Sequence, residues 1–292
     1  MLGAIVGDII GSRFERINWH GIEGAHKSKE FDLFTEDSVF TDDTICSCAT
    51  AKAIMCGVEG LTEGADPFAW WTWKIGREYL DRGFGGKFTE WLKADGDGPP
   101  PPFGSWGNGS AMRVSPIGWL DYGIADLLQK AEDSAKITHD HPDAVKGAKA
   151  VVHAIWLARH SAGVDKNVIK VVMKLHYYPT IGNLTLDEIR PTLEFKTDCQ
   201  STVPVAIQAF LESHSFEDAI RNAISVGGDS DTIAAITGSI AHAFYGEVPS
   251  SILKEALSRL TPDLLQIVRD FCGMFCNGMF GEKNLKALQL PT

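Results

Sequence analysis

Apolar residues recur every three or four positions along most of the chain, which is the spacing of the buried face of an α-helix. Short runs of glycine, proline and polar residues separate these segments, such as DRGFGG at 81–86 and YGEVP at 245–249. The pattern predicts helices over 42–57, 66–82, 143–161, 203–213, 217–225, 231–244 and 262–275.

Alternating patterns typical of β-strands are scarce. The best candidate is VIKVVMKLHYY, residues 168–178, whose spacing fits a helix as well. No low-complexity linker divides the 292 residues, and no repeat of fixed period is present. The sequence therefore predicts an all-α fold with a single compact domain over residues 1–292.

One long segment interrupts the helical pattern. Residues 93–118 contain a run of four prolines followed by Gly104, Gly107 and Gly109. Prolines and glycines at this density exclude a helix interior, and structureless segments of this length in compact domains are often functional. A variable surface insertion would explain the prolines. It explains SWGNGSAMR poorly, because there glycines alternate with hydrogen-bonding groups.

Two adjacent carboxylates open the helix predicted at 42–57. In VFTDDTICSC, residues 39–48, Thr41 is a suitable N-cap, and Asp42 and Asp43 fall in the first turn. The helix dipole stabilises aspartates at a helix start, so this motif alone needs no other explanation. Metal binding is the alternative, because adjacent carboxylates repel each other unless a cation lies between them.

A second acidic helix start lies far downstream, in VGGDSDTIAA. Asp229 stands at or near the cap, Asp231 and Thr232 lie in the first turn, and Gly227 and Gly228 permit a sharp entry. Repetition of the motif at two helix starts changes the balance between capping and metal binding, because the two clusters can meet in the fold.

Small residues suggest how the two clusters meet. Ala234, Gly238 and Ala241 share one face of the downstream helix, which allows a neighbouring helix to approach closely. That neighbour is either the helix beginning at Thr41 or the segment GAIVGDIIG, residues 3–11, whose glycines also share a face. Four carboxylates and two hydroxyls gathered there would require cations. Oxygen-only ligands select hard ions such as Mg²⁺ or Mn²⁺, and a binuclear site fits this number of ligands.

Composition limits the partners and the compartment. The net charge of −11 argues against duplex nucleic acid or an anionic membrane as the main partner. The six cysteines lie in apolar surroundings and indicate reduced, buried thiols of a cytoplasmic protein. A zinc site combining CSC at 46–48 with the cysteines of CGMFC at 272–276 is disfavoured, because the standard two-residue spacing is missing.

The amino-terminal segment does not resemble a signal peptide. MLGAIVGDIIG has no basic residues before its apolar run, and the run contains Asp8. Nowhere does the chain approach the roughly 20 apolar residues that a membrane-spanning helix needs.

Five motifs together resemble a known family. GAIVGDIIGS, TDDT, GNGSAMRVSPIG, THDHPDAVKGA and VGGDSDTIAAITGSIAHAFYG occur in the order typical of the ADP-ribosylglycohydrolases, the group of dinitrogenase reductase-activating glycohydrolases and ADP-ribosyl-acceptor hydrolases. The resemblance spans roughly residues 3–246. It implies an all-α fold of this type, with two divalent cations between helices, that hydrolyses the bond between ADP-ribose and an acceptor.

The resemblance also implies a set of site residues. The metal ligands would be Thr41, Asp42, Asp43, Asp229, Asp231 and Thr232. The family's acidic residue after the opening glycine motif, which gates the site, falls on Glu15, although Glu36 and Asp37 are competitors. Glu15 could instead pair with Arg13 or Arg16.

The segment 105–112 resembles the family's diphosphate-binding loop. The candidate ligand-binding residues are Ser105, Trp106, Gly107, Asn108, Gly109, Ser110 and Met112. Successive backbone N–H groups of a glycine-rich turn can bind an anion without a lysine. Arg113 lies in the helical continuation, where we expect a structural salt bridge. His139 is expected to line the ADP-ribose cleft, whereas His141 neighbours a helix cap.

The resemblance implies a metal-dependent hydrolase that cleaves at the anomeric carbon of the distal ribose. Asp42, Asp43, Asp229 or Glu15 would act as the general base. The substrate would be ADP-ribose linked to a protein side chain, a nucleic-acid base or a small O-acyl compound, and the enzyme would be a monomer. The alternatives are a non-catalytic ADP-ribose-binding protein and a phosphohydrolase, because DSDT resembles the D-x-D-x-T motif of haloacid-dehalogenase-like phosphatases.

Overall fold

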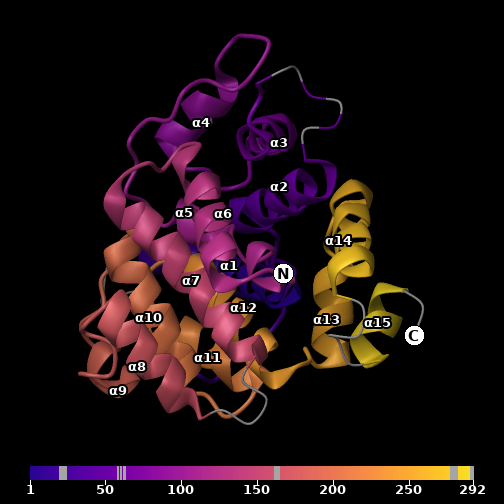
Figure 1. Ribbon diagram of the computed structural model, residues 1–292. Coiled ribbons are helices and arrows are strands. Elements are labelled where there is room, and N and C mark those ends of the chain that lie inside the picture. The colour runs from indigo at the N-terminus through magenta and orange to yellow at the C-terminus, as the bar shows by residue number, and fades with distance from the viewer. Residues whose placement is uncertain are drawn as a thin grey trace.

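The computed structural model describes residues 1–19, 25–57, 59, 61, 64–160, 165–276 and 282–289. Within them the chain is built of α-helices joined by loops and short 3₁₀ turns, without a β-strand (Figure 1). The all-α prediction is therefore confirmed. The α-helices are α1 (Leu2–Trp19), α2 (Asp42–Cys56), α3 (Pro67–Gly76), α4 (Gly86–Lys93), α5 (Gly109–Met112), α6 (Ile124–Lys136), α7 (Pro142–His160), α8 (Lys166–His176), α9 (Leu186–Ile189), α10 (Cys199–Leu211), α11 (Phe216–Ser225), α12 (Ser230–Tyr245), α13 (Ser250–Leu257), α14 (Pro262–Phe275) and α15 (Glu282–Leu288).

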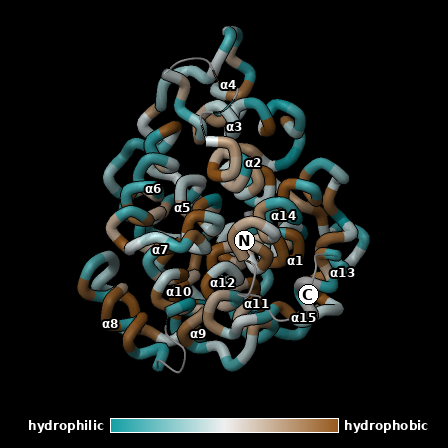
Figure 2. The backbone as a smooth tube through the Cα atoms, turned by 45° about the vertical axis from the view of Figure 1, so that its right-hand side comes forward, coloured by the Kyte–Doolittle hydropathy of each residue, from teal (hydrophilic) through white to brown (hydrophobic). Residues whose placement is uncertain are grey.

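Helix α12 forms the centre of the fold. It contacts α1, α7, α10 and α11, and its residues from Ser230 to Ala243 are all buried. The tube view places α12 among these helices, with hydrophilic turns around the outside (Figure 2). A helix surrounded in this way must be apolar or small on every side, as ITGSIAHA at 236–243 is.

Helices α1 and α12 approach each other more closely than side chains would allow. A Cβ atom built on Gly3 would lie 2.0 Å from the Gly238 carbonyl oxygen, and one on Gly7 would lie 2.1 Å from that of Ala234. The glycines of α1 are therefore required for this contact. Of the two neighbours considered for α12, the structure selects the segment GAIVGDIIG, and Gly11 then lies beside the first turn of α12.

The start of α2 is fixed to α1 by one buried carboxylate. Asp8 accepts hydrogen bonds from the Thr41 N–H at 3.0 Å and the Thr41 hydroxyl at 2.6 Å, and also from the N–H and hydroxyl of Thr44. The first turns of α2 and α12 are thus both held against α1, which brings the two acidic motifs together.

A second, smaller apolar cluster lies between α3, α4 and α5. Trp73 of α3, Phe88 and Trp91 of α4 and Met112 of α5 pack together there. The proline run crosses this unit, and the Trp91 indole N–H donates to the Pro100 carbonyl at 2.9 Å. The irregular segment predicted from 93 is confirmed as far as residue 108, after which α5 begins.

The predicted helices are present with shifted ends. The 66–82 segment forms α3 followed by a 3₁₀ turn at Arg77–Tyr79, and α10 starts earlier than predicted because Asp198 caps it. The strand candidate at 168–178 is helix α8, which begins after the Asp165 cap and buries Ile169 and Met173 on one face.

The cysteines agree with the expected reduced state. All six are free thiols, and five of them are buried. The groups of potential metal ligands found among the described residues contain no cysteine, so the zinc alternative has no support there. None of the described helices has the length and apolar character needed to cross a bilayer.

Candidate functional site

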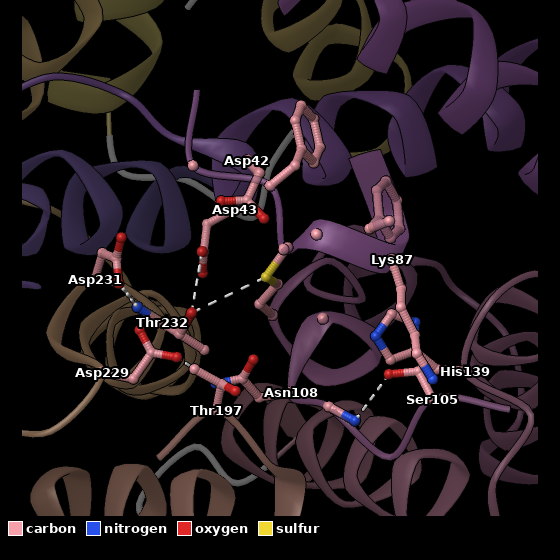
Figure 3. A pocket seen from close by; sticks show the side chains of 18 of the residues that line it. Asp42, Asp43, Lys87, Ser105, Asn108, His139, Thr197, Asp229, Asp231 and Thr232 are labelled. Carbon is pink, nitrogen blue, oxygen red and sulfur yellow. Dashed lines mark hydrogen bonds between the residues drawn. The ribbon is translucent and has the colours of Figure 1, made fainter. Parts of the chain in front are cut away.

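A cavity of about 690 Å³ opens where the starts of α2 and α12 face the loop that leads into α5. Figure 3 shows Asp42, Asp43, Asp229 and Asp231 at one end of this cavity, and Lys87, Ser105 and His139 at the other. The two ends differ in chemistry, because the first carries carboxylates and the second carries hydrogen-bond donors and aromatic rings.

The carboxylate end contains more acidic groups than the two motifs predicted. We call it the acidic cluster, which consists of Asp8, Glu15, Asp42, Asp43, Asp229 and Asp231. Carboxylate oxygens of Asp8, Asp43 and Asp231 lie within 4.8 Å of one another, as do those of Glu15, Asp229 and Asp231. Asp231 belongs to both triplets. The cluster therefore offers two adjacent sets of oxygen ligands that share one residue.

Burial of so many like charges raises their proton affinities. Loss of solvent is the largest cause, and it raises the pKa of Asp42, Asp43 and Asp231 well above the usual value, with repulsion from the neighbouring carboxylates adding to it. The pKa of Asp8 rises to about 6 for the same first reason, although its hydrogen bonds from Thr41 and Thr44 oppose the shift. Such a cluster is stable as anions only with cations.

One buried oxygen of the cluster has no hydrogen-bond partner. Asp43 Oδ1 is fully enclosed and accepts nothing, whereas Oδ2 accepts the Thr232 hydroxyl at 3.1 Å. A buried carboxylate oxygen left without a donor is costly, and a metal ion would satisfy it. Together with the all-oxygen donor set, this atom fits a hard divalent cation.

Asp8 was missed as a site residue in the sequence. It appears there only as a charge inside an apolar run, because GDIIG was interpreted by hydropathy and not by the face on which Asp8 lies. The available signal was a charged residue between Gly7 and Gly11, on a helix whose glycines mark a close contact. A buried aspartate in such a place needs specific partners.

The two threonines of the predicted ligand set lie differently. Thr232 lines the cavity beside Asp43. Thr41 is buried, and its hydroxyl donates to Asp8. In this arrangement the Thr41 hydroxyl orients Asp8, a member of the acidic cluster. Its role as a direct ligand stays a prediction.

The location of Glu15 favours it over Glu36 and Asp37 as the acidic residue that gates the site. Glu15 lines the cavity, and the residues that line it do not include Glu36 or Asp37. Arg13, which could have paired with Glu15, donates instead to the Asp32 carbonyl and lies 4.3 Å from the centre of the Phe14 ring. The side chain of Arg16 lies outside the described residues.

Most backbone N–H groups of the predicted diphosphate loop already have acceptors. Gly104 N–H donates to Asp140 at 2.8 Å, Gly107 N–H to the Ser105 hydroxyl at 3.1 Å, and Asn108 N–H to the Thr197 carbonyl at 2.8 Å. A chain of free N–H groups across the loop is therefore not what the structure contains. Any anion contact through the backbone is limited to the remaining groups, at positions 106, 109 and 110.

Asn108 connects this loop to the acidic cluster. Its side-chain amide donates to Asp229 at 2.6 Å and to the Thr202 hydroxyl at 3.0 Å. The Asp229 carboxylate does not cap its own helix through its side chain, and it is oriented by hydrogen bonds with Asn108 and with the Asp231 side chain. The loop and the acidic cluster are thus held together by the Asn108 side chain.

The structure divides the other predicted loop residues into two groups. Ser105, Gly107, Gly109, Met112 and His139 line the cavity. Two others lie elsewhere. Trp106 is 59% exposed with its ring 6.0 Å from that of His141, and Ser110 is fully buried and donates to the Ala144 carbonyl at 2.9 Å. Stacking of a base on Trp106 within the cavity is not supported by this placement.

The salt bridge expected for Arg113 is wrong. Arg113 is fully buried, and its guanidinium donates to the Ser134 carbonyl at 2.6 Å and to the Thr138 hydroxyl at 3.1 Å. Among the described residues no carboxylate pairs with it. Burial lowers the pKa of Arg113 to about 10, which leaves it charged at neutral pH.

The far wall of the cavity was not predicted. Phe84, Phe88 and Phe103 line it. Phe195 and the exposed Lys87 also line the cavity. Phe84 and Phe88 are stacked with centroids 5.3 Å apart. DRGFGG at 81–86 was interpreted as a turn, and no helix was predicted for residues 86–93. The spacing of Phe88, Trp91 and Leu92, three and four residues apart, was the signal for an amphipathic helix, α4.

Comparison with known proteins identifies the family of this chain. The ADP-ribosylglycohydrolase family profile matches residues 1–278. Human ADP-ribosylhydrolase ARH3 is 27% identical in an alignment covering 86% of each chain. The ADP-ribosyl-[dinitrogen reductase] glycohydrolase of Rhodospirillum rubrum is 26% identical, over 87% of each chain.

A solved structure supports the fold. An ADP-ribosylglycohydrolase-related protein complex superposes with a TM-score of 0.62 at 21% identity, over 98% of this chain and 95% of the other. The haloacid-dehalogenase-like alternative is wrong, because helix α11, and not a strand, precedes DSDT. The family profile spans most of the chain and both relatives are hydrolases by name, so this protein is an enzyme of the ADP-ribosylglycohydrolase family.

Proposed function

We propose that this enzyme removes ADP-ribose from a modified acceptor by metal-dependent hydrolysis at the anomeric carbon of the distal ribose. The observation that carries the proposal is the acidic cluster, whose two carboxylate triplets share Asp231 at one end of the cavity. Family membership supplies the ADP-ribosyl group as the substrate class.

The acidic cluster is suited to two divalent cations, with Mg²⁺ favoured and Mn²⁺ as the alternative. Asp43, Asp229, Asp231 and Thr232 would hold them, with Asp42 and Glu15 at the open side. When bound, the cations would polarise a water molecule and the ribose hydroxyls and would offset the carboxylate charges.

The chain's own groups would then complete the reaction. A carboxylate of Asp42, Asp43, Asp229 or Glu15 accepts the proton of the attacking water. Glu15 and Asp42 are the partly exposed members of the acidic cluster, so they reach substrate and water most directly. Burial of the others leaves the side of Glu15 and Asp42 as the approach for water.

The opposite end of the cavity is suited to the adenosine diphosphate part. Phe88 and Phe103 offer ring faces and edges to a base. Lys87 is the single lysine or arginine among the described lining residues, and His139 adds a further donor. These side chains take over the anion contacts that the occupied backbone N–H groups of the loop do not provide.

The acceptor is the open part of the proposal. Arginine and serine side chains, nucleic-acid bases and O-acyl groups are the candidates, and the R. rubrum relative is named for action on dinitrogen reductase. We further propose a cytoplasmic location, which the free thiols favour, and a monomeric state. The non-catalytic alternative loses its basis, because its signature would be lost aspartates and all four are in place.

A substrate screen with a metal-ligand variant tests the function. Peptides ADP-ribosylated on arginine or serine, ADP-ribosylated nucleic acid and O-acetyl-ADP-ribose are incubated with and without Mg²⁺, and released ADP-ribose is measured. Asp231→Asn should reduce the rate by at least about 100-fold, because both ligand sets lose their shared carboxylate.

The matched control is Asp126→Asn, which removes an exposed aspartate from the first turn of α6 and should leave the rate unchanged. Hydrolysis of one substrate that persists in excess chelator, or that survives in Asp231→Asn, would contradict the proposed metal dependence. Absence of hydrolysis with all four substrate classes would contradict the function itself.

A further inference from the structure

Arg113 is an unusual buried cation, and its contacts converge on one threonine. A single terminal nitrogen of the guanidinium donates to the carbonyls of Ser134 at 2.6 Å and Ala135 at 3.3 Å, and to the Thr138 hydroxyl at 3.1 Å. The other two guanidinium nitrogens have no acceptor among the described residues. A buried arginine without a carboxylate is costly, which points to a function beyond stability.

The contact with Thr138 determines the state of His139. Thr138 Oγ1 lies 2.7 Å from His139 Nδ1. An arginine N–H donates and cannot accept, so Arg113 cannot take up the hydrogen of the Thr138 hydroxyl. Among the contacts of the described residues, His139 Nδ1 is the one acceptor within reach of that hydrogen. A Thr138 oxygen that accepted from both neighbours would leave its own buried hydrogen without an acceptor, which is costly. Nδ1 is therefore the acceptor. In a neutral ring, the proton then resides on Nε2.

The charged form of His139 is disfavoured in the same surroundings. The side chain is 5% exposed, and burial followed by the positive charge of Arg113 holds the pKa of His139 well below its usual value. The ring therefore stays neutral at physiological pH, with one donor and one acceptor at fixed positions.

The donor nitrogen lies over the glycine loop at the cavity. A Cβ atom built on Gly109 would lie 2.8 Å from His139 Nε2, and one on Gly107 would lie 3.4 Å from it. Gly109 thus leaves the space that the ring occupies. His139 lines the cavity together with Ser105 and Lys87, at the end opposite the carboxylates (Figure 3).

We propose that Arg113 and Thr138 are positioning residues that fix His139 as the neutral Nε2–H tautomer, so that it presents a permanent hydrogen-bond donor to an anionic oxygen of the substrate. The opposite tautomer would present a lone pair to that oxygen and repel it. The identity of the substrate rests on the proposed function, whereas the tautomer does not. His139 consequently serves in binding and is not a proton donor or acceptor in the chemical step.

The tautomer is measured directly by long-range ¹H–¹⁵N correlation NMR on ¹⁵N-histidine-labelled protein at neutral pH, with the His139 signals identified by their loss in His139→Gln. We expect a protonated Nε2 and an unprotonated Nδ1 in the wild type and in Thr138→Ser, which keeps the hydroxyl. Thr138→Val should give a mixture of tautomers. A wild-type spectrum of the Nδ1–H tautomer or of an imidazolium ring would overturn the proposal.

Calorimetry with free ADP-ribose tests the consequence for binding. Thr138→Val should weaken affinity about tenfold, which corresponds to about 1.4 kcal/mol, and Thr138→Ser should restore it. The matched control is Thr237→Val, which removes the hydroxyl of another fully buried threonine that donates to the Ala206 carbonyl. Arg113→Met should reproduce the mixed tautomers of Thr138→Val if the chain of hydrogen bonds is the cause.

The outcomes separate the proposal from the function on which it rests. If Thr237→Val weakens affinity as much as Thr138→Val, or if the tautomer changes while affinity does not, the positioning role is wrong. If the wild type does not bind ADP-ribose, the proposed substrate class is wrong. The assignment of Arg113 and Thr138 then depends on the tautomer spectra alone.

Discussion

Glu15 could act as a metal ligand or as a gate of the cavity, and the two roles predict different effects of substitution. Its carboxylate lies within 4.8 Å of those of Asp229 and Asp231, as a ligand would, and it is partly exposed at the cavity, as a gate would be. We expect Glu15→Gln to retain Mg²⁺ binding and to lose most of its hydrolysis, because the amide preserves shape and removes the charge. Calorimetric Mg²⁺ titration and hydrolysis rates measure the two effects.

The control for this change is Glu36→Gln, since Glu36 does not line the cavity. A Glu15→Gln variant that no longer binds Mg²⁺ would identify Glu15 as a ligand and refute the gate. Full activity in this variant would show that the carboxylate is not needed in the reaction.

At the scale of residues, the sequence identified those site residues that belong to a short local motif. Asp42, Asp43 and Asp231 stand at helix starts, and their shared chemistry was visible without coordinates. Asp8 and Arg113 were misjudged, because their partners are far away in sequence and their own surroundings are apolar or helical. Burial decides what a charged residue must do, and burial is a property of the fold.

At the scale of helices, the contact between α1 and α12 determines the geometry of the acidic cluster. Asp8 and Glu15 come from α1 and Asp231 from α12, so any change in the separation of the two helices moves ligands of both triplets. Gly7→Ala would place a methyl group 2.1 Å from the Ala234 carbonyl oxygen. We expect this overpacking to cost about 1–3 kcal/mol of stability and to weaken Mg²⁺ binding.

Chemical denaturation and Mg²⁺ titration measure these two losses. Gly123→Ala is the matched control, since a Cβ there would meet only an Asp126 oxygen at 3.9 Å. Unchanged Mg²⁺ affinity in a folded Gly7→Ala protein would show that the glycine contact does not position the ligands.

The sequence predicted which face of a helix carries small residues. It did not predict which other helix packs against that face. The small residues of 3–11 and 234–241 indicated a close contact, yet two candidate neighbours for α12 were left open. The loop at 104–110 shows the same limit. Its composition predicted free N–H groups, but the acceptors that occupy them, Asp140 and Thr197, come from segments that only the tertiary fold brings near.

At the scale of the whole molecule, the acidic cluster couples stability to both pH and metal. The raised pKa of Asp8, Asp43 and Asp231 means that the metal-free folded chain binds protons more tightly than the unfolded chain. The stabilisation from this tighter proton binding is fully present at pH values below the unfolded pKa, near 4. It is lost as the pH rises through the pKa values of the folded chain, and the folded value for Asp8 is about 6. His139 and His242 act in the opposite direction, because their pKa values are lowered.

A comparison between wild type and Asp43→Asn isolates the acidic cluster from the histidines, since both proteins share them. In excess chelator, Asp43→Asn should melt at a higher temperature than the wild type, and the difference should be larger at pH 7.5 than at pH 5. With saturating Mg²⁺ the order should reverse, because only the wild type has the complete ligand set. A ligand present at 100 times its Kd stabilises by about 2.7 kcal/mol, which is on the order of 5 °C for a chain of this size. Thermal melts at the two pH values provide the measurement.

If Asp43→Asn is the less stable protein in chelator at both pH values, the carboxylates do not repel one another in the folded state, and the physical argument for a metal site fails.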